Sequence, residues 1–207
     1  MRIHQVLIVP AAGHMGDGKP YSRGREDQNL SECDIVDRYV LGLQEELDEC
    51  SIRHSICPTR KPPGVTLKDR GTVFPHTLVL SCAVGWLRPG KAPQSNISRV
   101  FYGQKEAGGI AKDMALALGA WGNIYTDYGH RSANAFMDPD DPVITGAGAW
   151  GLRLEPFAIN GPHAIEYAKR LENLGRDIGR VVTDYLMLKD EGRNKPSSLA
   201  TWVPRTT

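Results

Sequence analysis

The sequence lacks an excess of charge of either sign. Its 207 residues include 25 lysines and arginines and 24 aspartates and glutamates, which gives a formal net charge of +1. Because the two signs are mixed along the chain, they create no field that would hold a nucleic-acid backbone or an anionic membrane surface. We therefore expect no nucleic acid and no membrane among the partners of this chain.

Cysteine and long hydrophobic runs are also scarce. The four cysteines, at positions 33, 50, 57 and 82, show neither the paired spacing of a zinc knuckle nor the density of a disulfide-rich secreted scaffold. The apolar run near the start is interrupted at Pro10, and no segment approaches the length that spans a membrane. These absences predict synthesis in the cytoplasm without a signal peptide.

What the chain does have is enough apolar sequence for one well-packed domain, since 41% of its residues are hydrophobic. We expect residues 1–190 to form this domain and residues 191–207 to form an extended tail. Apolar runs and alternating patterns bounded by proline or glycine predict strands, and apolar positions three or four residues apart predict helices. The predicted strands are 5–9, 51–57, 76–84, 98–103 and 151–157, and the predicted helices are 31–49, 105–121 and 162–191.

This alternation of strands and helices predicts an α/β fold, a single domain with a mostly parallel twisted sheet flanked by helices. A capping pattern, Ser31 followed by Asp34, marks the start of the first helix. The polar segment 123–142 has no regular pattern and is predicted to be a functional surface loop. In sheets of this kind, functional sites gather at the carboxyl ends of the strands.

Three polar residues lie where such a site is expected. His14 follows the first strand in the stretch "GHMG", although a loop histidine is most often only a hydrogen-bonding turn residue. Glu32 falls in the first turn of the first helix, where a carboxylate also suits the helix dipole. Glu155 ends an apolar strand, where a charge is costly unless it is used or paired.

The stretches around these residues resemble the zinc-dependent N-acetylmuramoyl-L-alanine amidases of the autolysin and phage-endolysin type. The resemblance runs from Val6 to about Leu188. "IVPAAGHMGD" is similar to the opening strand and zinc turn of that family, and "LSECDIVDRYVLGLQEEL" to its ligand glutamate and first helix. "LRLEPFAINGPHAIEY" is similar to the catalytic segment of the family and carries Glu155. An unrelated α/β domain with chance matches is the remaining alternative.

The resemblance implies a peptidoglycan hydrolase that cleaves the amide between N-acetylmuramic acid and L-alanine of the stem peptide. It implies one zinc ion, with His14 and Glu32 as ligands, and Glu155 as the general acid and base. Zinc with an open position acidifies a bound water, and a glutamate beside that water accepts its proton and passes it to the leaving amine. Peptidoglycan or a muropeptide would be the substrate, so the protein would act on the cell wall or be carried in a phage particle.

The sequence departs from the family pattern at the third ligand. Alignment on Ser81 puts Ala83 where the family has a histidine. Cys82 is chemically able to replace that histidine, although neighbours on a strand point to opposite faces, and His130 from the irregular loop is a second possible substitute. Two hypotheses follow: an amidase with a rearranged zinc site, or a catalytically inactive amidase-fold protein. The second would serve as a structural or binding component with assembly partners in a larger particle, for example a phage particle.

Overall fold

The structure, a computed structural model, describes residues 3–11, 14–16, 19–21, 24–25, 30–57, 76–86, 98–125, 133–138, 144 and 150–190. For residues 14–16, 19–21, 24–25, 122–125, 133–134 and 188–190 it describes the backbone alone. The predicted tail, 191–207, lies outside the described residues and stays a prediction. Within the described part of the chain, no helix combines the length and the apolar character that crossing a membrane requires.

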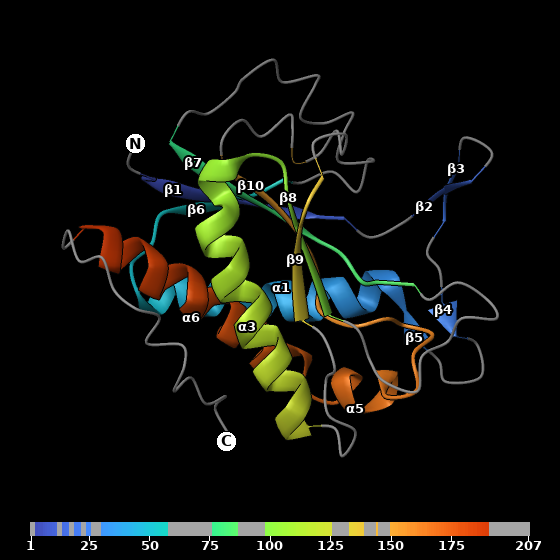
Figure 1. Cartoon of the computed structure of the whole chain (residues 1–207). Helices are drawn as coiled ribbons and strands as arrows, with labels where there is room; N and C mark the ends of the chain where they lie inside the picture. The colour runs from blue at the N-terminus through green and yellow to red at the C-terminus, as the bar shows by residue number, and fades with distance from the viewer. Residues whose placement is uncertain are drawn as a thin grey trace.

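A six-stranded sheet with the order β6-β1-β7-β10-β8-β9 forms the centre of the molecule (Figure 1). Its strands are β1 (Gln5–Pro10), β6 (His54–Ile56), β7 (Thr77–Cys82), β8 (Ser98–Tyr102), β9 (Ala133–Met137) and β10 (Gly151–Glu155). The first four in the spatial order run parallel, and β8 pairs antiparallel with β10 while β9 runs parallel to β8. The predicted α/β fold with a mostly parallel sheet is therefore confirmed.

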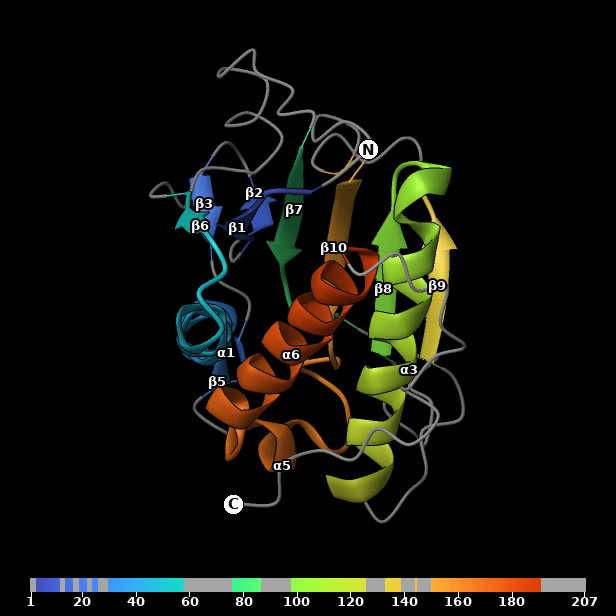
Figure 2. The same ribbon diagram turned by 90° about the vertical axis from the view of Figure 1, so that its left-hand side faces the viewer.

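The three long helices cover one face of this sheet. Figure 2 shows α1 (Glu32–Glu49), α6 (Leu171–Asp190) and α3 (Gly108–Tyr125) in a row beside the strands. Val6 and Ile8 of β1 belong to the large core that these helices complete, whereas Leu7 and Val9 belong to a small second cluster. Since successive strand residues face opposite sides, the large core lies on the helix side of the sheet.

The first helix begins where the sequence predicts. The Ser31 hydroxyl accepts a hydrogen bond from the Asp34 backbone N–H at 3.1 Å and donates one to the Asp34 carboxylate at 2.6 Å. This cap makes Glu32 the first residue of α1, on the buried face that Ile35 and Tyr39 continue. The helix ends at Glu49 with Cys50 as its cap, and the φ of 55° at Ser51 allows the Ile52 N–H to donate back to the Leu47 carbonyl.

Helices α1 and α6 touch backbone to backbone. A Cβ atom added to Gly42 of α1 would overlap the Glu172 carbonyl of α6, and one added to Gly175 of α6 would overlap the Tyr39 carbonyl of α1. Only glycine permits so close an approach. The position of Tyr39 is therefore set by α6 as well as by its own helix.

The structure corrects two predicted elements. Part of the predicted loop 123–142 is strand β9, because pairing with β8 places Phe136 opposite Phe101 with 5.7 Å between the ring centroids. The predicted helix 162–191 is divided into α5 (Ala164–Ala168) and α6. The division has a local cause, since Arg38 donates to the Ala168 carbonyl and Arg170 bonds back only three residues, to Tyr167.

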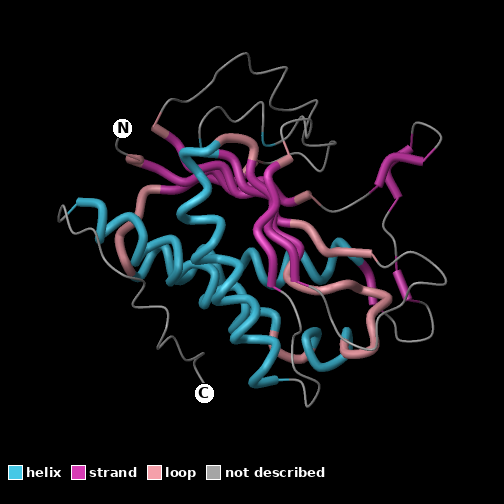
Figure 3. The backbone as a smooth tube through the Cα atoms, viewed as in Figure 1, coloured by secondary structure: helices cyan, strands magenta, loops and turns pink. Residues whose placement is uncertain are grey.

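A third correction concerns the segment after β1. The sequence predicts a turn at "HMG", whereas its backbone forms the short strand β2 (His14–Gly16), which pairs antiparallel with β3 (Lys19–Tyr21). A second short pair joins β4 (Gly24–Arg25) to β5 (Leu30–Ser31). Figure 3 shows both pairs apart from the central sheet.

Candidate active site

Three parallel strands end at one level of the sheet. Cys82, the last residue of β7, is in register with Pro10 of β1 on one side and with Leu154 of β10 on the other. The Ala83 N–H donates to the Leu154 carbonyl at 3.0 Å. Ala83 and Glu155 therefore lie next to each other at the carboxyl edge, where a site is expected in a parallel sheet.

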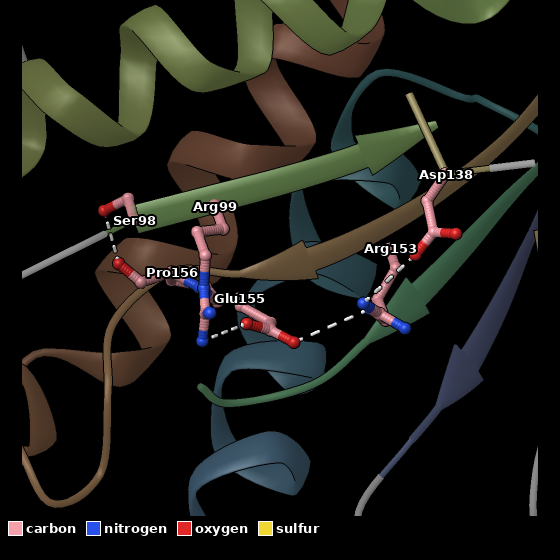
Figure 4. A network of polar contacts seen from close by, with 6 residues as sticks. All are labelled: Ser98, Arg99, Asp138, Arg153, Glu155 and Pro156. Carbon is pink, nitrogen blue, oxygen red and sulfur yellow. Dashed lines mark hydrogen bonds and ion pairs between the residues drawn. The ribbon is translucent and has the colours of Figure 1, made fainter. Parts of the chain in front are cut away.

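Glu155 is the centre of a charged cluster at this edge (Figure 4). Its Oε2 atom lies 2.7 Å from Nη2 of Arg99, and its Oε1 atom lies 3.6 Å from Nε of Arg153. Arg99 stands directly opposite Glu155 in the antiparallel β8–β10 register, and Arg153 precedes Glu155 by two residues on the same face of β10. The charge that the sequence placed at the end of an apolar strand is therefore paired.

The outer part of the cluster holds Arg153 in place. Its guanidinium lies over the Phe101 ring at 4.2 Å from the centroid and 3.9 Å from the Asp138 carboxylate. The segment after Glu155 is also fastened, since the Ser98 hydroxyl donates to the Pro156 carbonyl (Figure 4). The surroundings of Glu155 are thus built from β8, β9 and β10 together.

Cys82 lies on the other side of the sheet from this cluster. Its side chain is fully buried in the core below β7, beside the Tyr39 hydroxyl, which donates to the Ala83 carbonyl at 2.9 Å. Burial raises the pKa of the Cys82 thiol to about 12, although its hydrogen bond with the Tyr39 side chain acts to lower that pKa. The pKa of Tyr39 is also raised well above its ordinary value. Burial is the largest cause, and the neighbouring Cys82 adds to the shift. Since a metal is bound by the thiolate, this position does not favour Cys82 as a ligand.

The other predicted ligands fall in different parts of the chain. Glu32 is described and is only 2% exposed at the start of α1. The backbone of His14 lies in β2, but its side chain lies outside the description, and His130 lies outside the described residues altogether. The structure thus brings Ala83, Cys82 and Glu155 to one edge, and the assignment of His14, Glu32 and His130 as ligands stays a prediction.

The donors at this edge do not by themselves make a zinc site. Where the structure describes side chains, no group of three histidine, cysteine, aspartate or glutamate residues could hold a metal ion. Ala83 carries no donor atom, and the neighbouring thiol is turned into the core. A structural or catalytic zinc needs at least three protein ligands, so the described donors do not complete one.

Sequence reasoning missed the partners of Glu155. Arg153 could have been found, because residues two apart on a strand share a face. Arg99 could not, because it reaches Glu155 only through the register of two strands whose pairing the sequence does not specify.

No family model matches the sequence, and no curated protein matches it by sequence comparison. Similarity appears instead at the level of structure. The catalytic domain of CwlV, an N-acetylmuramoyl-L-alanine amidase from Bacillus (Paenibacillus) polymyxa var. colistinus, aligns with a TM-score of 0.63 and 13% identity over 88% of this chain and 98% of that one.

Two further solved structures agree. The catalytic domain of the CD27L endolysin, which targets Clostridia difficile, aligns with a TM-score of 0.64 and 14% identity over 89% of this chain and 97% of that domain. Ami1, an N-acetylmuramyl-L-alanine amidase from Mycobacterium smegmatis, aligns with a TM-score of 0.68 and 12% identity over 89% of this chain and 98% of that one. The six-stranded domain described above therefore has the fold of N-acetylmuramoyl-L-alanine amidase catalytic domains.

Proposed function

We propose that this chain is a peptidoglycan amidase that cleaves the bond between N-acetylmuramic acid and L-alanine of the stem peptide. The observation that carries the proposal is the placement of Glu155 at the carboxyl edge of a sheet that matches amidase catalytic domains over 88–89% of the chain. A carboxylate at that edge is in the position where α/β sheets carry their chemistry. The protein would act on the cell wall, either directly or as part of a phage particle.

In this proposal Glu155 is the general acid and base. Its carboxylate accepts a proton from a water molecule as the water oxygen bonds to the amide carbonyl carbon. The same proton passes to the leaving nitrogen as the carbon–nitrogen bond breaks, so the products are a muramic acid carboxylate and a free L-alanine amine. Zinc would be held by His14 and Glu32, with His130 as the proposed third ligand in place of Ala83.

One observation favours a second candidate, a catalytically inactive amidase-fold module. The position beside Glu155 is Ala83, and both carboxylate oxygens of Glu155 face a guanidinium group. A carboxylate used purely as a counter-ion for Arg99 and Arg153 would have the same surroundings. Such a module would bind peptidoglycan or serve as a structural component of a larger particle.

Zinc content and hydrolysis measured on the purified full chain separate the two candidates. We expect about one zinc per chain after dialysis against metal-free buffer, and release of stem peptides from purified muropeptides measured by mass spectrometry. A chain with neither zinc nor hydrolysis, supplied with added zinc and still without product, would establish the inactive module instead. Binding to insoluble peptidoglycan in a sedimentation assay would then show whether the module keeps the ligand.

A further inference from the structure

The two oxygens of the Glu155 carboxylate have unequal surroundings. Oε2 is buried and lies 2.7 Å from Nη2 of Arg99, an ion-pair distance at which the angles are not those of a hydrogen bond. Oε1 lies 3.6 Å from Nε of Arg153, which is longer than a hydrogen bond. Because Oε2 is buried, the 14% of the Glu155 side chain that remains exposed belongs to its other atoms. One oxygen is therefore held and the other is less tightly engaged.

Arg153 is kept from closing on Oε1 by its other contacts. Its guanidinium is spread over the Phe101 ring at 4.2 Å and faces the Asp138 carboxylate at 3.9 Å on the far side from Glu155. Figure 4 shows the contact with Asp138, which follows β9, on the other side of Arg153 from Glu155. Arg153 therefore supplies positive charge near Oε1 without occupying that oxygen.

Gly85 fixes the other side of the Arg99–Glu155 pair. A Cβ atom at position 85 would lie 3.1 Å from Nη2 of Arg99 and 3.3 Å from Oε2 of Glu155. The backbone of Gly85 cannot move aside easily, because its N–H donates to the Phe157 carbonyl at 2.8 Å and its carbonyl accepts from Ile159 at 2.9 Å. Glycine at this position leaves the ion pair the space that it occupies.

We propose that Arg99 is a positioning residue for Glu155: it holds Oε2 and leaves Oε1 as the oxygen that accepts the proton. The proposal rests on the proposed function, since it assigns the two oxygens their parts in that reaction. A guanidinium on one oxygen fixes the direction of the other, and a displacement of about 1 Å in a reacting group is enough to cost about 100-fold in rate. Arg99 itself touches neither the water nor the amide.

The test compares three variants of the full chain in muropeptide hydrolysis, with kcat and KM measured separately. Arg99→Gln should lower kcat by about 100-fold, the cost of a misplaced reacting group, and leave KM little changed. Arg99→Lys should recover part of the loss, because an ammonium can still pair with Oε2 but offers no planar fork. Arg153→Gln, the matched control with the same change of charge beside the same carboxylate, should cost much less than Arg99→Gln.

Several outcomes would overturn the proposal. If the wild type hydrolyses muropeptides and Arg99→Gln keeps its kcat, Arg99 does not position Glu155, although the proposed function stands. Equal losses in Arg99→Gln and Arg153→Gln would show that only charge matters. A wild type without hydrolysis would remove the proposed function and this assignment together. Should Arg99→Gln fail to fold, Arg99→Met takes its place: it keeps an apolar stem of similar length and removes the charge, and a wild-type kcat in that variant would contradict the proposal.

Discussion

The ends of β7 and β10 are neighbours in the sheet and yet present opposite kinds of surface. Strand β10 ends in the carboxylate of Glu155, which pairs with Arg99 of β8 and Arg153 of β10. Strand β7 ends at Cys82 and is followed by Ala83, which has no polar side chain and whose carbonyl accepts a hydrogen bond from the buried Tyr39 hydroxyl. The two ends are joined by the hydrogen bond from Ala83 to Leu154.

The proposed amidase needs a general acid or base and a third zinc ligand. The end of β10 offers a residue for the first part, and the end of β7 offers none for the second. Glu155 is a carboxylate paired with two guanidinium groups, and Ala83 is part of a structural junction with Tyr39 and Leu154. If the protein is a hydrolase, the donor missing at β7 has to come from elsewhere in the chain. The predictions below test each end in turn.

The largest expected effect follows from the β10 end. Glu155→Gln keeps the shape of the side chain and removes the proton acceptor, so hydrolysis of muropeptides should fall by about 100- to 10,000-fold. Asp138→Asn is the matched control, because it makes the same change at the outer end of the same cluster. Stem-peptide release close to wild type in Glu155→Gln would show that the carboxylate is only a counter-ion.

The next effect concerns the β7 end and zinc affinity. If the protein lacks a third ligand, Ala83→His should tighten zinc binding by more than about 100-fold, since even the outer partners of a zinc ligand contribute about 10- to 100-fold. Isothermal titration with zinc measures the dissociation constant of both proteins. A parent that already binds zinc tightly should gain little, which would indicate a substitute such as His130. A parent without zinc that gains nothing would refute the alignment of Ala83 with the ligand position.

A smaller effect is expected from the junction beneath β7. Tyr39→Phe removes the hydroxyl that donates to the buried Ala83 carbonyl, and an unpaired buried acceptor costs about 1 to 3 kcal/mol in the free energy of unfolding. Urea denaturation followed by circular dichroism gives the value. Tyr102→Phe, at a half-buried tyrosine of β8, is the control and should change stability little. Equal stability of Tyr39→Phe and the wild type would mean that water replaces the hydroxyl.

The smallest effect is a pH dependence of stability. An ordinary thiol titrates near pH 9.0, and burial raises the pKa of Cys82 to about 12 in the folded chain. The folded state therefore keeps a proton that the unfolded state releases, so the contribution is complete below pH 9 and is lost as the pH rises toward 12. The urea midpoint of unfolding can be measured at about pH 8 and about pH 10, on either side of the ordinary thiol pKa. Between these two pH values the midpoint should decrease more in the wild type than in Cys82→Ala. Identical differences would show that the thiol does not contribute.

The difference between the two ends also shows what the sequence could predict. Continuous apolar runs identified β1 and β7, and the isolated glutamate after the apolar residues of β10 indicated a site at that edge of the sheet. Strand β9 was missed because "ANAFM" has no β-branched residue, and only its pairing with β8 makes it a strand. Arg99 was missed for the same reason, since strand register depends on contacts between segments far apart in the chain.

The contact between Gly175 and the Tyr39 carbonyl has a consequence for how the edge of the sheet forms as the chain folds. Gly175, in the last described helix, packs against the backbone of α1 at Tyr39. The hydroxyl of Tyr39 in turn donates to the Ala83 carbonyl just after β7. During synthesis, α1 and β7 leave the ribosome well before α6 does. Contacts between distant segments carry a loop-closure cost that slows folding, so we expect the carboxyl edge to be completed only when α6 has docked.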